Sequence, residues 1–216
     1  MGPEPARTVL VILPNWLGDL VMSAGFLARL SSAARPSRVD VAVPEHLADL
    51  ASLLPGVTRV HAWRRQDYRG LSGAFRLGRQ LRQSGPFATC YCLPRSFRSA
   101  VTAFASGAGE RVGYRQELRS FLLTRAVRRR SGVHRVIEYL RLVPGTPEAP
   151  DLGTNVHVAR PEGSAFGELG ISPERPAVAL NIHSEAQARR MALGKWARVV
   201  GALSAGPARS IVLLGS

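Results

Sequence analysis

The sequence lacks the segments that send a protein into or across a membrane. Its N-terminal residues, MGPEPARTVL, contain no apolar core of the kind found in signal peptides. The longest apolar stretch is interrupted by Pro14, Asn15 and Gly18, so it falls short of the ~18 residues that a membrane-spanning helix needs. We therefore expect a cytoplasmic protein.

Cysteine is almost absent. The two cysteines, Cys90 and Cys92, lie two residues apart, so in a strand both side chains point to the same face. A zinc site needs further Cys or His ligands, and the sequence has no second cysteine pair and no histidine cluster nearby. We expect two buried free thiols, no metal site and a reducing compartment.

Lysine is nearly absent as well, yet the chain is strongly basic. One lysine, Lys195, stands among 29 basic residues against 15 acidic ones, which gives a formal net charge of +14. Such a charge attracts polyanions, whether nucleic acid, anionic lipid or a phosphorylated glycan. A GC-rich genome explains the abundance of arginine equally well. No nucleic-acid-reading motif or aromatic stacking platform accompanies the charge, so no specific nucleic acid is expected as a partner.

The chain is organised around the segment Val9 to Ser23, VLVILPNWLGDLVMS. Val9 to Leu13 form an apolar run without alternation, which is typical of a strand covered on both faces. Pro14 and Asn15 end the strand, and apolar residues then recur at helical spacing. Asp19 is thereby predicted at the carboxyl edge of the first strand, where open α/β sheets bind their ligands. The alternative is that Asp19 only complements a helix dipole.

Alternating strand and helix patterns follow and predict a doubly wound parallel α/β sheet. After a first helix to about Leu30, strands are expected at Val39–Val43 and Val57–Ala62, with a helix at Glu45–Leu53 between them. The first turn is PNWLGD rather than a glycine-rich loop. This disfavours a dinucleotide such as NAD or FAD, and no cofactor is expected.

A later strand end also carries polar side chains. Phe87–Leu93 is predicted to be a buried strand that runs into PRSFRSA, which places Ser96 and Arg98 where a helix begins. A helix N-terminus with hydroxyl groups and an arginine suits a phosphate or a sugar.

A basic amphipathic helix is expected at Leu71–Gln83, with Arg76, Arg79 and Arg82 on its polar side. A solvated face is the ordinary interpretation of these arginines. The alternative is a helix oriented toward an anionic membrane surface.

A second α/β unit is predicted after residue 165, so that the domains are 1–165 and 166–216. Its strands are expected at Val178–Ile182 and Ile211–Leu214, with a helix at Lys195–Leu203 between them. One β-α-β unit cannot cover both faces of its sheet. The chain is therefore expected either to be a fragment or to expose an apolar patch.

Two segments carry a family resemblance. Pro14, Trp16 and the Gly18–Asp19 pair follow the first strand, and LPRSFRSA ends the later one. In the same order come five further matches: Gly113, Tyr114, Arg115, Leu118 and Arg119. This pattern resembles the ADP-heptose:lipopolysaccharide heptosyltransferases, in particular the heptosyltransferase II type.

The resemblance implies a GT-B fold, with a complete N-terminal Rossmann-like domain followed by the first β-α-β of a second, nucleotide-sugar-binding domain. It also implies inverting transfer of heptose from ADP-heptose to the inner core of lipopolysaccharide, at the cytoplasmic face of the inner membrane. Asp19 is then the catalytic base. The acceptor-binding residues are expected to be Trp16, Gly18, Ser96, Arg98 and Arg115, and the donor phosphates are expected to meet Arg189 and Arg190.

The second domain departs from the family pattern. His183, Ser184 and Glu185 replace the family's Pro-Gly-Ala, and Arg189 replaces a lysine. Arginine keeps the charge but changes the geometry, while Glu185 brings negative charge toward a diphosphate. The alternative is a truncated or decayed, non-catalytic module that binds an anionic glycolipid or a protein partner.

Overall fold

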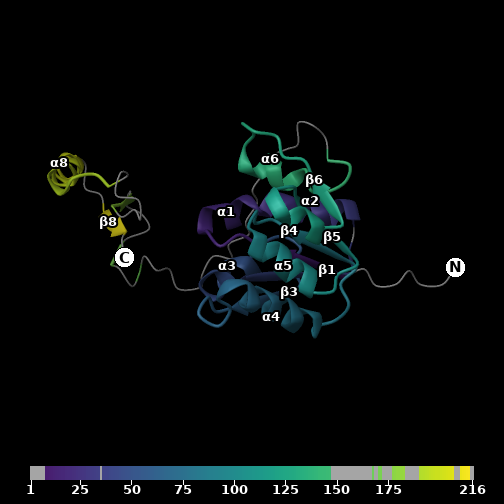
Figure 1. Cartoon of the computed structure of the whole chain (residues 1–216). Helices are drawn as coiled ribbons and strands as arrows, with labels where there is room; N and C mark the ends of the chain where they lie inside the picture. Colours follow the sequence, from purple (N-terminus) through teal and green to yellow (C-terminus); the bar gives the residue numbers. More distant parts are fainter. Residues whose placement is uncertain are drawn as a thin grey trace. The chain divides into compact units, whose positions relative to one another are not determined.

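The structure is a computed structural model that describes residues 8–34, 36–146, 167, 170–171, 177–182, 190–206 and 210–214 (Figure 1). The chain divides into two compact units, Met1–Val158 and Ala159–Ser216. The predicted boundary between residues 165 and 166 falls outside the described residues and stays a prediction.

A six-stranded sheet forms the centre of the first unit, in the order β3-β2-β1-β4-β5-β6. Its strands are β1 (Thr8–Ile12), β2 (Arg38–Pro44), β3 (Arg59–Trp63), β4 (Thr89–Cys92), β5 (Glu110–Tyr114) and β6 (Arg125–Val127). All neighbouring pairs are parallel, and Val11 of β1 lies between Val41 of β2 and Tyr91 of β4. The expected doubly wound parallel sheet is confirmed.

Helices cover both faces of this sheet (Figure 1). Val9 and Val11 of β1 contribute to the core under α2 (Ala24–Ala34) and α6 (Arg135–Leu140). Leu10 and Ile12 point the other way, into the core under α4 (Gly70–Arg82) and α5 (Phe97–Ala105). Because both faces are buried, the strand has no polar alternation. The remaining elements are α1 (Leu17–Met22), η1 (Glu45–Leu47), α3 (Ala48–Ser52) and η2 (Glu117–Leu122).

The expectation of one opening helix to Leu30 is wrong. The helix breaks at Ser23, which is buried between α1 and α2 and whose hydroxyl donates to the carbonyl of Leu20 at 2.6 Å. Such local bonds compete with helix continuation. The helix expected at Glu45–Leu53 is likewise divided into η1 and α3.

The strand patterns missed β5 and β6. β5 carries Glu110 and Arg111 at its start and Gly113 near its end, and β6 has only three residues. Neither strand contains an apolar run long enough to stand out from a loop. Their place in the sheet follows from pairing with β4 and with each other.

The two cysteines lie in β4 as expected. Both are buried and unpaired, and they contribute to the same core beneath α4 and α5. Burial raises the pKa of both thiols. The prediction of two free, buried thiols is confirmed.

The described residues of the second unit form one β-α-β motif. β7 (Ala177–Asn181) and β8 (Ser210–Leu214) pair in parallel, and α8 (Leu193–Ser204) lies between them in the sequence. These bounds match the predicted strands and helix closely. Among the described residues, no helix has both the length and the apolar character needed to cross a bilayer.

Close packing of α4 on α5 gives a stability prediction. A Cβ atom at Gly78 would lie 2.5 Å from both the Cβ of Ala105 and the carbonyl oxygen of Thr102. We expect Gly78→Ala to lower the free energy of unfolding by about 1–3 kcal/mol, because overpacking outweighs the gain in helix propensity. Urea unfolding measures this change.

Gly18→Ala is the matched control, because a Cβ atom at Gly18 meets nothing within 4 Å. If both substitutions leave the unfolding midpoint unchanged, the helices do not pack as described.

Candidate active site at the carboxyl edge of the sheet

The carboxyl ends of β1 and β4 lie side by side at the centre of the sheet. From this point the strand order runs outward in both directions, and such switch points are where open α/β sheets bind ligands. The two loops that leave these strands lead into α1 and α5. These loops and the first turns of the two helices carry most of the first-unit residues that the sequence singled out.

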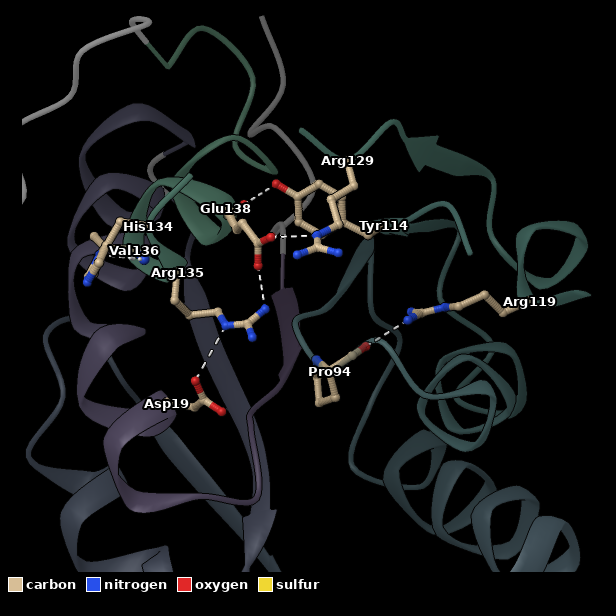
Figure 2. Close-up of polar contacts among 9 residues, drawn as sticks. All are labelled: Asp19, Pro94, Tyr114, Arg119, Arg129, His134, Arg135, Val136 and Glu138. Carbon is tan, nitrogen blue, oxygen red and sulfur yellow. Dashed lines mark hydrogen bonds and ion pairs between the residues drawn. The ribbon is translucent and has the colours of Figure 1, made fainter. Parts of the chain in front are cut away.

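Asp19 lies in the first turn of α1 and is half-buried. Its carboxylate forms an ion pair with the guanidinium of Arg135 at 3.5 Å, so α6 supplies its partner (Figure 2). Trp16 and Gly18, which precede it, are exposed. The side chain of Trp16 makes no capping hydrogen bond to α1.

Glu138 of α6 is the buried acid of this region, with 3% of its surface exposed. Its carboxylate accepts a hydrogen bond from Nε of Arg129 at 2.7 Å, and its second oxygen binds Nη1 of Arg135 (Figure 2). One carboxylate therefore holds two guanidinium groups, and one of these groups also reaches Asp19.

Two tyrosines pack beneath this network. Burial raises the pKa of Tyr139, and the nearby Asp19 carboxylate raises it further, while Arg135 and Arg95 act in the opposite direction. Burial also raises the pKa of Tyr114 to about 12. The Tyr114 hydroxyl donates to the main-chain carbonyl of Glu138 (Figure 2). Both hydroxyls therefore stay protonated at neutral pH.

A basic pocket of about 500 Å³ lies at the ends of β4 and β5. Its lining residues are Arg95, Ser96, Arg115, Gln116 and Arg129. Three of the five are arginines and none is acidic. Arg129 links this pocket to Glu138, because it lines the first and pairs with the second.

Local hydrogen bonds occupy Ser96. Its hydroxyl caps α5 by accepting from the backbone N–H of Ser99 at 3.2 Å. The Ser99 hydroxyl in turn donates to the carbonyl of Pro94 at 3.0 Å. Ser96 therefore lines the basic pocket as part of a fixed helix start.

Arg98 does not join Ser96 and Arg115. Its Nε donates to the carbonyl of Gly70 at 3.2 Å, and its Nη2 donates to the carbonyl of Tyr68. It lines a separate pocket, which is formed by Arg65, Gln66, Arg69, Gly70 and Arg98. The acceptor-binding roles of Arg98, Ser96, Arg115, Trp16 and Gly18 stay predictions.

Arg119 is a buried residue that donates hydrogen bonds to the end of β4 and to the loop between β4 and α5. Only 1% of its surface is exposed. It donates to the Pro94 carbonyl at 2.9 Å (Figure 2) and to the Cys92 sulfur at 3.1 Å. A buried guanidinium needs such partners, and here they are main-chain and thiol groups of the strand end.

The expected donor residues are only partly within the described residues. Arg189 lies outside them, as do His183, Ser184 and Glu185, while Arg190 is described just before α8. Their contact with donor phosphates stays a prediction. The described residues contain no group of three or more His, Cys, Asp or Glu side chains that could hold a metal ion.

The sequence patterns gave three residues of this region no role in the site: Arg129, Arg135 and Glu138. They lie more than a hundred residues from Asp19 in the chain, in segments without a recognised ligand motif. The nearest signal is the run of three arginines, Arg128 to Arg130, which precedes α6.

Solved structures of heptosyltransferases share this architecture. The chain is 25% identical to Escherichia coli ADP-heptose lipopolysaccharide heptosyltransferase II, with a TM-score of 0.78 over 97% of this chain and 65% of that one. An E. coli heptosyltransferase with ADP-2-deoxy-2-fluoro heptose has the same fold, with 16% identity, a TM-score of 0.68, and coverage of 97% and 70%.

Sequence comparison points to the same proteins. The chain is 32% identical over 116 residues to lipopolysaccharide heptosyltransferase 2 of E. coli K12, and this match covers 53% of the chain and 33% of the relative. The matched part thus spans about a third of that relative's length.

The family model for glycosyltransferase family 9 (heptosyltransferase) matches residues 74–216. This range includes β4, the basic pocket, the arginine pair on Glu138 and the second unit. The expectation drawn from the two motifs is confirmed: the chain belongs to glycosyltransferase family 9, the heptosyltransferase family.

Proposed function

We propose that the protein transfers heptose from ADP-heptose to the inner core of lipopolysaccharide, with inversion at the anomeric carbon. The observation that carries the proposal is the Asp19 carboxylate after the carboxyl end of β1. Its ion pair with Arg135 connects it through Glu138 to Arg129, which lines the basic pocket. The likeness to heptosyltransferase II supports it.

In this reaction Asp19 accepts the proton of the acceptor hydroxyl as its oxygen attacks the anomeric carbon of the heptose. The bond between that carbon and the diphosphate breaks, and ADP leaves with the bonding electrons. Arg135 holds the Asp19 carboxylate from the α6 side. Glu138 fixes Arg135, so the base is anchored by two successive ion pairs.

The basic pocket suits the acceptor. Lipopolysaccharide core sugars carry anionic groups, and Arg95, Arg115 and Arg129 offer guanidinium donors without a lining carboxylate. Guanidinium groups bind phosphate and carboxylate through paired hydrogen bonds. We place the anionic group of the acceptor in this pocket and its hydroxyl at Asp19.

We assign binding of the ADP-heptose donor to the second unit. Arg189, Arg190 and the N-terminus of α8 are proposed to stabilise the departing ADP by charge and by free backbone N–H groups. The solved relative with ADP-2-deoxy-2-fluoro heptose supports a nucleotide-heptose donor. Because the acceptor is a membrane glycolipid, we place the enzyme at the cytoplasmic face of the inner membrane.

The role of Asp19 is tested by Asp19→Asn in the protein as its own cells produce it. We expect kcat to fall by about 10²–10⁴-fold, because general base catalysis contributes about this much. Rates are measured as ADP release from ADP-heptose in the presence of the acceptor.

Asp49→Asn is the matched control, since Asp49 is also an acid in the first turn of a helix, α3, but is exposed and belongs neither to the ion pairs of Glu138 and Arg135 nor to the lining of the basic pocket. Equal rates for Asp19→Asn and the unsubstituted protein would reduce Asp19 to a helix-dipole role. Absence of any ADP-heptose turnover in the unsubstituted protein would favour the non-catalytic module.

The role of the basic pocket in acceptor binding is tested by Arg129→Gln. We expect the acceptor KM to rise about tenfold, because a charged hydrogen bond contributes about 1.5 kcal/mol or more. The neighbouring exposed Arg128, which does not line the pocket, gives the control Arg128→Gln. The pocket assignment fails if the two variants have the same KM, or if the increase persists with an acceptor stripped of its phosphates.

The buried acid is tested by Glu138→Gln. Loss of its charge weakens the bonds to Arg129 and Arg135, and we expect the free energy of unfolding to fall by about 1.5–3 kcal/mol. Glu110→Gln is the control, because its ion pair with Arg125 at 3.0 Å is more exposed and should contribute about 0–1 kcal/mol. Denaturant unfolding at pH 7 compares the two. Equal losses would mean that Glu138 has no special place in the network.

A further inference from the structure

Exposed apolar side chains gather on the layer formed by α4, α5 and η2. α4 presents Leu71, which is 51% exposed, and Phe75, which is 43% exposed. Five large side chains on these elements are exposed and together define the outer apolar face: Leu71, Phe75, Phe104, Leu118 and Phe121. The buried stripe of α4, which includes Leu77 and Leu81, faces the sheet instead. The outer face therefore has no role in the core.

The three elements pack side by side, with α4 against α5 and α5 against η2. The hydroxyl of Thr102 in α5 donates to the Ala74 carbonyl in α4 at 3.1 Å. η2 packs on α5, where the rings of Phe97 and Phe121 lie 6.3 Å apart. The outer apolar face is thus fixed in place by hydrogen bonds and packing beneath it.

Arginines are concentrated on α4 and on the loop before it, beside the α4 part of this face. The segment from Arg64 to Gln83 contains six arginines and one acidic residue, Asp67. Arg79 and Arg82 are exposed in the last turn of α4. Arg76 donates to the main-chain carbonyl of Asp67 at 2.8 Å, not to its carboxylate. In the described part of the chain, Arg69, Arg76, Arg79 and Arg82 form no ion pair.

We infer that the outer apolar face docks the protein on an anionic phospholipid bilayer. A surface with apolar side chains and unpaired arginines binds such a bilayer in two ways. The apolar side chains are buried below the headgroups, and the arginines pair with the lipid phosphates. A second copy of the chain fits this face poorly, since it would bring the same arginines against one another. The inference deepens the proposed function, whose acceptor is carried by a membrane.

The position of the face agrees with this role. α4 follows β3 and α5 follows β4, so both helices begin at the carboxyl edge of the sheet, where the basic pocket also lies. Leu71 and Phe97 are in the first turns of these helices. Docking through the face would bring that edge close to the bilayer.

A bimane label at position 75 tests the docking directly. In Phe75→Cys the label enters at the new thiol, because Cys90 and Cys92 are buried and burial raises their pKa. We expect a blue shift of the bimane emission with phosphatidylglycerol vesicles and none with phosphatidylcholine vesicles. Leu53→Cys, at an exposed apolar position after α3, is the matched control and should show no shift.

Vesicle sedimentation measures the contributions to affinity. We expect Phe75→Ser to weaken binding to phosphatidylglycerol vesicles about tenfold, as expected when a large apolar side chain is no longer buried. Arg79→Gln and Arg82→Gln should each weaken it about fivefold, in line with the effect of one arginine near an anionic surface. Arg59→Gln, at an exposed arginine of β3, is the control and should leave binding unchanged.

Equal binding to both kinds of vesicle, or an equal shift at positions 53 and 75, would overturn the inference. So would sedimentation of a dimer that Phe75→Ser dissociates, since the partner would then be a second copy. The vesicles contain neither donor nor acceptor. Docking with no heptose transfer would therefore leave this inference standing and contradict the proposed function alone.

Discussion

The candidate site depends on one buried carboxylate. Glu138 binds the guanidinium groups of Arg129 and Arg135 at the same time. A buried acid is costly unless it is paired, and two cations together satisfy both of its oxygens. Because Arg135 also meets Asp19 and Arg129 also lines the basic pocket, the same carboxylate connects the proposed base to the proposed anion site. The short helix α6 thereby fixes the relative positions of Asp19, which is in α1, and Arg129, which follows β6.

The strand ends give this network its frame. A parallel sheet brings every carboxyl end to one edge, so the loops after β1 and β4 meet although some eighty residues separate them in the chain. Arg119 holds the second loop by its hydrogen bonds to Pro94 and Cys92. The serine cap at Ser96 then fixes the start of α5. The pocket is built on backbone that is constrained on both sides.

Sequence patterns predicted the sheet and the position of Asp19 after its first strand. Both predictions rest on local signals: an apolar run, a break and a helical repeat. The patterns did not predict β5 and β6, whose pairing depends on neighbours rather than on their own composition. They also gave Arg135 and Glu138 no role in the site, since a contact between α1 and α6 exists only after the sheet has formed. Arg98 shows a different failure of the sequence patterns. It was predicted to bind the acceptor, because it is an arginine at the start of a helix that follows a strand, but its guanidinium donates to the main-chain carbonyls of Gly70 and Tyr68.

The abundance of arginine, which the sequence could not interpret, divides into distinct uses in the structure. Arg98, Arg111 and Arg119 each donate to two groups on other segments of the chain, mostly carbonyls. A lysine ammonium cannot bridge such pairs with a planar fork of donors, so arginine is needed at these positions whatever the genome composition. The pocket and the outer apolar face take a second group, whose charges, apart from that of Arg129 on Glu138, are open to a ligand. Genome composition therefore cannot be the whole explanation of the arginine content. The first group meets a geometric requirement of the fold. The second group lies at the surface where, in the proposed function, an anionic substrate and an anionic membrane would meet.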